Sequence, residues 1–206
     1  MQEENPRLIL ASGSPRRREL LAAMGVRFEV RPTDVDESAL PGESPEQHVR
    51  RLARNKSRAQ VLAGELVLAA DTVVVIDGDV LGKPRDGDDA QQMLRRLSGR
   101  RHGVLTGLAL TVGSLENTVD SLERSEVEIA PITEEEIVWY VATGEPLDKA
   151  GSYAIQGLGA LFVTSVKGNY TNVVGLPLPP TQALFRSLGF DLRQFCRTGG
   201  VPSCLR

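Results

Sequence analysis

Apolar runs along the chain indicate strands at regular intervals. Residues 7–12 form one such run, and residues 66–76 form a longer one that a single Asp interrupts. A nearly continuous apolar run predicts a strand covered on both faces. Residues 102–112 alternate between apolar and polar positions, and a short connection joins them to residues 117–130, which predicts an antiparallel hairpin of two long strands. Shorter extended segments are expected at 28–31, 80–81 and 159–166.

Capping signals place helices between these strands. Ser14-Pro15 and Ser44-Pro45 each combine an N-cap residue with Pro at the first helical position. The first of these helices should close at Gly25 and the second should run to about Ala63. Further helices are expected over 86–97, from Thr133 with Glu136 completing a capping box, and from Gly175-Leu176-Pro177 to about residue 187. Interleaved helices and strands predict an α/β fold with a mixed sheet.

Composition narrows the class of protein. The 206 residues suit one domain or two closely packed lobes without repeats or a linker, and a 41% hydrophobic and 25% charged composition is ordinary for a globular protein. The two cysteines and two histidines suggest neither a disulfide framework nor a zinc site. The chain has no membrane-length apolar run and no signal-peptide pattern, so a cytoplasmic protein is expected. The glycines and proline beyond Arg197 predict a loosely ordered tail.

Charge points to a small anionic partner. The net charge of −3 gives no global basic field, and aromatic residues make up only 4% of the chain. Basic residues nevertheless gather at 16–18 and between 50 and 58. A nucleic-acid-binding module using these clusters is an alternative, but single-strand binders need aromatic stacking platforms. The clusters fit a small polyanion better.

The first helix begins in a pattern suited to phosphate. A helix N-terminus presents unpaired N–H groups and a partial positive charge. Here it is surrounded by Ser12, Ser14, Arg16 and Arg17, which together would form a compact anion site. The alternative is a surface helix with an ordinary cap and solvated arginines.

Four polar residues elsewhere in the chain lie at positions where folding alone does not call for a polar side chain. Asp71 lies inside the apolar run 66–76, where a carboxylate is costly unless it is paired or coordinates a metal; a buried structural Asp is the alternative. Lys56 falls on the apolar stripe of its helix and should reach an anion or extend to solvent. Lys83 precedes Pro84, which favours extended backbone and an outward side chain. Gln156, in a Gly-rich segment, could read the edge of a base or simply stand in a turn.

Taken together, these segments resemble the Maf family of nucleotide pyrophosphatases. The matches occur in order over roughly residues 8–190, and their joint occurrence is far more specific than any one of them. They are Leu10–Arg17, Asp36–Glu37, Ala53–Lys56, Ala70–Val74, Gly82–Pro84, Leu97–Gly99 with His102, Thr106–Gly107, Gly144–Pro146, Asp148–Gly151, Gln156–Gly157 and Gly168–Pro177.

The resemblance implies a fold and an activity. The implied fold is an elongated mixed β-sheet with flanking helices and two lobes around a cleft, related to the inosine triphosphate pyrophosphatases. It would form a single domain over 1–192, with 193–206 as a loosely ordered tail. The implied enzyme is a house-cleaning hydrolase that converts a nucleoside triphosphate to the monophosphate and pyrophosphate with a divalent cation, Mg²⁺, Mn²⁺ or Co²⁺. The implied partner is the nucleotide, not nucleic acid or a membrane, with a homodimer left open.

The resemblance also assigns roles to residues. Three positions track substrate within the family: Arg16, Thr72 and Gln156 match the branch acting on dTTP and UTP, whereas Trp, Glu and Asp mark the branch acting on 7-methyl-GTP. Asp71 would be the catalytic base, or would position the water or metal instead. Glu37 and Asp71 would hold the metal. The substrate-binding residues would be Ser12, Ser14, Arg16, Arg17, Lys56, Lys83, Thr72 and Gln156.

A nucleotide-sensing regulator remains the other alternative. Family members are linked to inhibition of septum formation, and such a protein would bind nucleotide without releasing pyrophosphate. The full set of polar residues in the expected cleft favours an enzyme.

Overall fold

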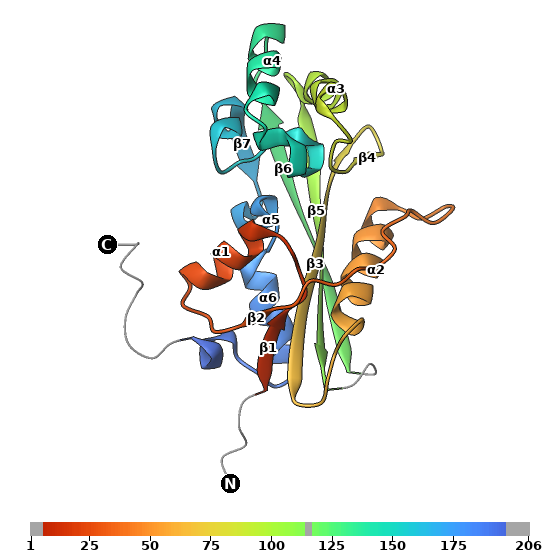
Figure 1. Ribbon diagram of the computed structural model, residues 1–206, viewed down its shortest axis with the longest axis vertical. Helices are drawn as coiled ribbons and strands as arrows, with labels where there is room; N and C mark the ends of the chain where they lie inside the picture. The colour runs from red at the N-terminus through yellow and green to blue at the C-terminus, as the bar shows by residue number, and fades with distance from the viewer. Residues whose placement is uncertain (1–5, 114–116, 197–206) are drawn as a thin grey trace.

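A single mixed sheet forms the long axis of the molecule (Figure 1). The computed structural model describes residues 6–113 and 117–196. In the described residues the sheet has seven strands: β1 (Arg7–Leu10), β2 (Glu29–Val30), β3 (Glu65–Ile76), β4 (Asp79–Leu81), β5 (Arg101–Val112), β6 (Thr118–Ile129) and β7 (Val163–Lys167). Their order is β2-β1-β3-β5-β6-β7, with β4 paired to β3. The strand β1 runs parallel to β2 and β3, and the other pairings are antiparallel. The expected mixed sheet and the long β5–β6 hairpin are confirmed.

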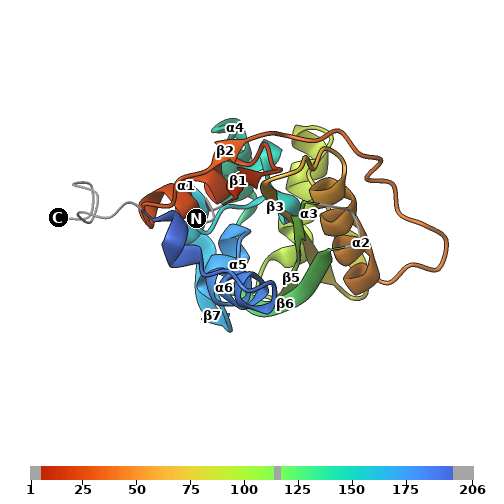
Figure 2. The ribbon, with the colours of Figure 1, turned by 90° about the horizontal axis from the view of Figure 1, so that it is seen from below.

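Helices cover both faces of this sheet. They are α1 (Pro15–Ala23), α2 (Pro45–Arg58), α3 (Gly87–Leu97), α4 (Glu134–Ala142), α5 (Tyr170–Val174) and α6 (Leu178–Ser187), with 3-10 turns η1 (Glu145–Asp148), η2 (Ala150–Ser152), η3 (Leu158–Phe162) and η4 (Leu192–Phe195). Figure 2 shows α2 on one side of β3, β5 and β6, and α1, α5 and α6 on the other. The helices α3 and α4 lie at the far end of the long strands (Figure 1).

Of the four hydrophobic clusters in the described residues, the two largest divide the core along the length of the sheet. One surrounds Phe185 of α6 and joins β1, the first half of β3 and the end of β5. The other surrounds Tyr140 of α4 and joins the second half of β3, the start of β5 and α3. Each cluster buries apolar surface from its own set of helices, and burial of this kind is the dominant stabilising contribution in a fold. The middle of β3 therefore lies between two separately packed ends.

Gly107 lets α2 lie directly against the sheet. A Cβ at this position of β5 would lie 2.2 Å from the Val49 carbonyl oxygen of α2. Gly107 is also the register partner of Asp71 on β3. The close approach therefore brings α2 over the point where the carboxylate interrupts the apolar strand. The capping box of Ser44 and Gln47 fixes the start of α2.

Several predicted boundaries were wrong. The helix α2 ends at Arg58 and not near residue 63, and the strand expected at 159–166 begins only at Val163, because residues 158–162 form the 3-10 turn η3. The polar loop after Gly168 contains the short helix α5, capped by Asn169. Local patterns are weak guides to such short elements, because tertiary contacts decide them.

Residues 193–196 belong to the packed fold, although they were expected in a loosely ordered tail. Phe195 is buried in the core beside Phe185, with ring centroids 5.7 Å apart, and Cys196 forms a β-bridge with Val26. The remainder of the expected tail, 197–206, lies outside the described residues.

The buried His102 makes folding stability depend on pH. It is 3% exposed, its Nε2 lies 2.8 Å from the Tyr153 hydroxyl, and burial lowers its pKa to about 4. A lowered pKa stabilises the fold above the unfolded value of about 6.5, and this contribution is lost as pH falls toward 4. We expect up to about 3 kcal/mol of pH-dependent stability from His102. Urea unfolding of the wild type and His102→Gln between pH 7 and 4 measures it, and an unchanged pH slope in the variant would contradict this expectation.

Candidate active site

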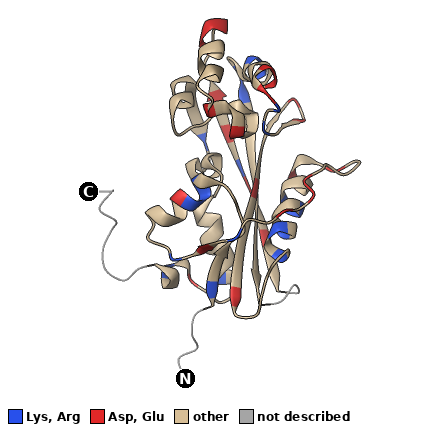
Figure 3. Cartoon of the chain, viewed as in Figure 1, with Lys and Arg blue, Asp and Glu red and all other residues tan. Residues whose placement is uncertain are grey.

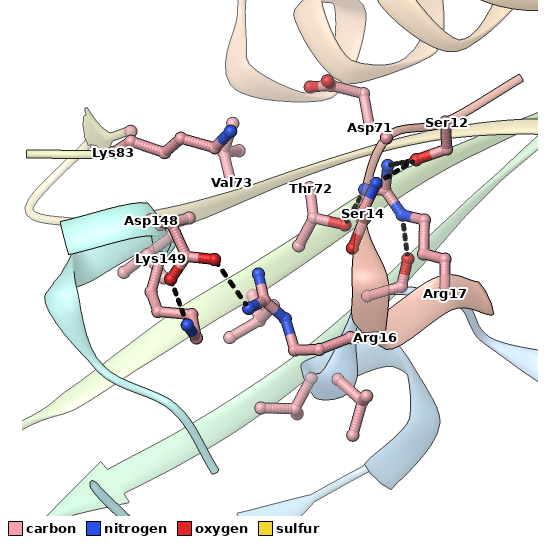
Figure 4. A pocket seen from close by; sticks show the side chains of 18 of the residues that line it. Ser12, Ser14, Arg16, Arg17, Asp71, Thr72, Val73, Lys83, Asp148 and Lys149 are labelled. Carbon is pink, nitrogen blue, oxygen red and sulfur yellow. Dashed lines mark hydrogen bonds and ion pairs between the residues drawn. The ribbon is translucent and has the colours of Figure 1, made fainter. Parts of the chain in front are cut away.

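A cleft of about 530 Å³ lies beside the middle of β3, between the two ends of the core. The β1–α1 connection, the start of α1, α2 and β3 supply part of its lining. The segment after β2 that contains Glu37, the loop after β4, residues between 148 and 156 and the end of α5 also contribute. Figure 4 shows Lys83 and the pair Asp148–Lys149 at one end of the cleft, and Ser12, Ser14 and Asp71 at the other. Figure 3 shows basic residues on α2 and at the start of α1, on either side of β3. All ten residues expected in the site line this cleft.

The start of α1 leaves polar groups available at the cleft. Ser14 is at the N-cap position with extended backbone, but its side chain makes no capping hydrogen bond. Its backbone N–H donates to Ser12 Oγ at 3.3 Å. The Ser14 hydroxyl and the first-turn N–H groups of α1 are therefore suited to an anionic ligand.

Arg17 is oriented by the protein itself. Its Nε donates to the Gly175 carbonyl oxygen at 2.8 Å, Nη1 donates to Ser12 Oγ at 3.0 Å, and Nη2 donates to Thr72 Oγ1 at 3.0 Å. Burial lowers the pKa of this guanidinium, which the charge of Asp71 partly offsets. A guanidinium has five N–H groups, so two remain for a ligand. Arg17 thus holds two cleft hydroxyls in place, a role that the sequence did not reveal.

Lys56 joins two carboxylates at the cleft wall. Its Nζ lies 2.7 Å from Asp71 Oδ1 and 2.7 Å from Glu37 Oε1. Lys56 and Asp71 are both buried, at 9% and 8% exposure, so the lysine does not extend to solvent. Burial opposes ionisation of Glu37, but the hydrogen bond and charge of Lys56 outweigh it and lower the Glu37 pKa. The three side chains form an ion cluster in which Lys56 and Asp71 are buried and Glu37 is exposed.

The second half of the cleft adds charges at its rim. Arg16 Nη1 lies 3.6 Å from Asp148 Oδ2, and Lys149 Nζ also donates to Asp148. Gln156 is exposed at the cleft, and Lys83 extends into it from the loop after β4. No role was predicted for Asp148 and Lys149, although they belong to the matching segment Asp148–Gly151 and form a charged pair ahead of the Gly-rich segment. Arg16 is thus linked to the opposite end of the cleft through Asp148.

The carboxylates fit a hard divalent cation. Asp71 Oδ1 and Glu37 Oε1 approach one ammonium from two parts of the chain, and each carboxylate has a second oxygen. One or two carboxylates plus substrate phosphates are the usual ligands of Mg²⁺. No cluster of three or more His, Cys, Asp or Glu side chains suited to a metal occurs in residues 6–113 and 117–196. The donor set therefore suits a cation that shares its ligands with a phosphate.

A mixed α/β fold with cationic and hydroxyl groups gathered around a buried carboxylate is suited to a phosphate-bearing ligand. The family model described as Maf-like protein matches residues 7–188. The chain belongs to the Maf-like protein family.

Relatives match over most of their length. A dTTP/UTP pyrophosphatase of Anaeromyxobacter dehalogenans is 58% identical over 189 residues, covering 91% of this chain and 96% of the relative. A dTTP/UTP pyrophosphatase of Escherichia coli O157:H7 is 53% identical over 180 residues, covering 86% and 90%. The solved structure of the Staphylococcus aureus Ham1 protein matches with a TM-score of 0.49 and 15% identity, covering 88% of this chain and 99% of that one.

No helix among the described residues combines the length and apolar character needed to cross a membrane.

Proposed function

We propose that this protein is a nucleoside triphosphate pyrophosphatase with a house-cleaning role. Its substrates would be dTTP and UTP, together with modified pyrimidine nucleotides, and its products the monophosphate and pyrophosphate. The relatives named dTTP/UTP pyrophosphatase support the reaction. The observation that carries the proposal in this chain is the Lys56–Asp71 pair, buried in a cleft whose other polar groups suit a triphosphate.

The cationic groups would bind the triphosphate. Arg16, Lys56 and Lys83 approach the cleft from three different elements, and the Ser12 and Ser14 region adds hydroxyl and N–H donors. Arg17 would contribute its two remaining N–H groups. Charges arranged in advance around the leaving pyrophosphate lower the barrier because they need not reorganise during the reaction.

Asp71 would prepare the attacking water. Its Oδ1 is hydrogen-bonded to Lys56, so Oδ2 is the oxygen that would orient the water or accept its proton. The water oxygen attacks the α-phosphorus, and the bond from that phosphorus to the oxygen bridging to the β-phosphate breaks. The electron pair of this bond leaves with pyrophosphate, and the water proton passes to Asp71 or solvent. Direct alignment by a carboxylate is a general route to this kind of rate enhancement.

Glu37 and Asp71 would hold a divalent cation, Mg²⁺, Mn²⁺ or Co²⁺. When bound, such an ion neutralises phosphate charge and polarises phosphate oxygens. Lys56, hydrogen-bonded to both carboxylates, would keep them turned toward the cleft.

Thr72 and Gln156 would read the pyrimidine base. The Thr72 Oγ1 atom accepts from Arg17 and lies 2.9 Å from the Thr106 hydroxyl, so the position of this oxygen is held by both neighbours. The Gln156 amide can both donate and accept, which suits the O4 and N3–H edge shared by uracil and thymine. Guanine would offer a mismatched edge and leave polar groups unpaired.

Oxygen-isotope labelling tests the reaction. Hydrolysis of dTTP in ¹⁸O water should place one ¹⁸O atom in dTMP and none in pyrophosphate, because attack occurs at the α-phosphorus. Mass spectrometry of the separated products reads the label. Label in pyrophosphate, or release of inorganic phosphate and dTDP, would refute the proposed reaction.

Lys83→Ala should lower kcat/KM for dTTP by about 10- to 100-fold, because a charge-assisted contact to phosphate contributes about 1.5–3 kcal/mol. Steady-state pyrophosphate release measures the change. Lys167→Ala, which removes an exposed lysine on β7, is the matched control. A wild-type kcat/KM in the Lys83 variant would place this lysine outside the binding site.

We further propose that the protein acts in the cytoplasm on free nucleotides, without nucleic acid or a membrane as a partner. The modest net charge and sparse aromatic residues support this proposal.

A further inference from the structure

The segment that presents Gln156 is fastened by two side chains that do not line the cleft. Residues 153–156 line the cleft, whereas Tyr140 of α4 and Glu145 of η1 lie behind them. The backbone N–H of Ala154 donates to the Tyr140 hydroxyl at 3.1 Å. The N–H groups of Leu158 and Gly159 donate to Glu145 Oε2 and Oε1 at 3.0 and 2.9 Å. Gln156 therefore stands between two anchored ends of one short segment.

The two anchoring side chains are joined to each other. The Tyr140 hydroxyl donates to Glu145 Oε1 at 2.8 Å, so the hydroxyl both donates and accepts, and the carboxylate accepts three hydrogen bonds. Burial opposes ionisation of Glu145, but the N–H groups of Gly159 and Leu158 and the Tyr140 hydroxyl outweigh it and lower the Glu145 pKa. The Tyr140 ring is fully buried and packs edge-on against Phe162. Hydrogen bonds and ring packing thus hold the side chains of Tyr140 and Glu145, which together form the anchor, in one arrangement.

Two glycines show how closely the segment lies on this anchor. A Cβ at Gly157 would lie 2.5 Å from Glu145 Oε2, and its φ of +123° is one that other residues rarely adopt. A Cβ at Gly159 would lie 2.5 Å from the Tyr140 hydroxyl. Both backbone positions therefore rest directly on the two anchoring side chains, immediately beside Gln156.

We infer that Tyr140 and Glu145 are positioning residues that set the base selectivity of the cleft by fixing Gln156. The inference rests on the proposed function, in which Gln156 reads the base. Polar recognition discriminates strongly only when the recognising group is held in one geometry by its surroundings. The cationic groups proposed to bind the triphosphate come from other elements, so loosening this segment should affect base recognition and leave triphosphate binding unchanged.

The variants Tyr140→Phe and Glu145→Gln test the inference. Tyr140→Phe removes one oxygen atom and leaves the Ala154 N–H without its acceptor. Glu145→Gln replaces one carboxylate oxygen by an NH₂ group, which cannot accept from the backbone N–H groups that the carboxylate now binds. For each, the ratio of kcat/KM for dTTP to that for dGTP should fall about tenfold, mainly through a higher KM for dTTP, as expected for one lost hydrogen bond to a charged or buried partner. Inorganic tripolyphosphate, a competitor without a base, should keep its inhibition constant.

The matched controls are Glu134→Gln and Tyr170→Phe, which alter exposed side chains away from the anchor. Hydrogen exchange of the amides of 154–159 should accelerate in the two test variants only. An unchanged ratio of kcat/KM for dTTP to that for dGTP, despite faster hydrogen exchange, would overturn the inference. An equal rise in the inhibition constant of tripolyphosphate would also overturn it. Tyr140→Phe preserves ring packing, so the test does not depend on Glu145→Gln folding. Absence of pyrophosphate release by the wild type would instead refute the proposed function.

Discussion

Asp71→Asn is expected to lower kcat for dTTP by about 10²- to 10⁴-fold while leaving the fold intact, the range for loss of a group that handles a proton in the transition state. The amide has the same shape as the carboxylate but cannot accept a proton from water or carry the charge that pairs with Lys56. Glu37 remains as a second partner of Lys56, so the buried ammonium keeps an opposite charge. Pyrophosphate release under saturating dTTP measures the loss.

Asp120→Asn is the matched control. Asp120 is also a mostly buried carboxylate, but it pairs with Arg50 and Arg54 over β6 and does not line the cleft. Circular dichroism and thermal unfolding should show both variants folded, with the activity loss confined to Asp71→Asn. A folded Asp71→Asn protein with near wild-type kcat would remove Asp71 from the reaction and leave it as a structural acid.

Replacing Arg16, Thr72 and Gln156 together by Trp, Glu and Asp should shift preference from dTTP to 7-methyl-GTP. The two new carboxylates would accept from the N–H groups of guanine, and a Trp ring suits the cationic methylated base. In the wild-type protein the Arg17 guanidinium donates to Thr72, so a Glu at position 72 would lie beside this guanidinium. We expect kcat/KM for dTTP to fall about 10²-fold or more, because the pyrimidine edge loses its partners.

Competition between the two nucleotides measures this shift directly, with product nucleotides separated by chromatography. Arg18→Trp, an exposed change on the same helix, is the matched control and should keep the wild-type preference. If dTTP preference survives the triple change in a folded protein, these three positions do not determine base specificity.

Local patterns predicted the framework of the fold because its long elements carry strong periodic and capping signals. The apolar run at β3, the β5–β6 hairpin, the Ser44-Pro45 start of α2 and the capping box of α4 are of this kind. The short elements η3 and α5 were not predicted, because five residues carry too little periodic signal and their conformation depends on contacts made elsewhere in the chain.

The residues of the candidate site could be predicted from the sequence, but the contacts among them could not. Asp71 and Lys56 violate the apolar pattern of their own elements, so each was identifiable as a residue that needs a partner. That they would contact each other depends on Gly107 admitting α2 to the sheet, which is a tertiary contact. Arg17 has the sequence context of a phosphate ligand, and only the positions of Gly175 and Thr72 reveal its second role.

The proposed activity is hydrolysis of dTTP and UTP in the cleft to monophosphate and pyrophosphate. Pyrophosphate release from a panel of dTTP, UTP, CTP, dATP, dGTP and modified pyrimidine triphosphates tests it, with Mg²⁺, Mn²⁺ or Co²⁺ present and with EDTA as the control. We expect metal-dependent release from dTTP and UTP and little from purine nucleotides. Binding of nucleotide without release from any triphosphate would contradict it and favour a nucleotide-sensing protein.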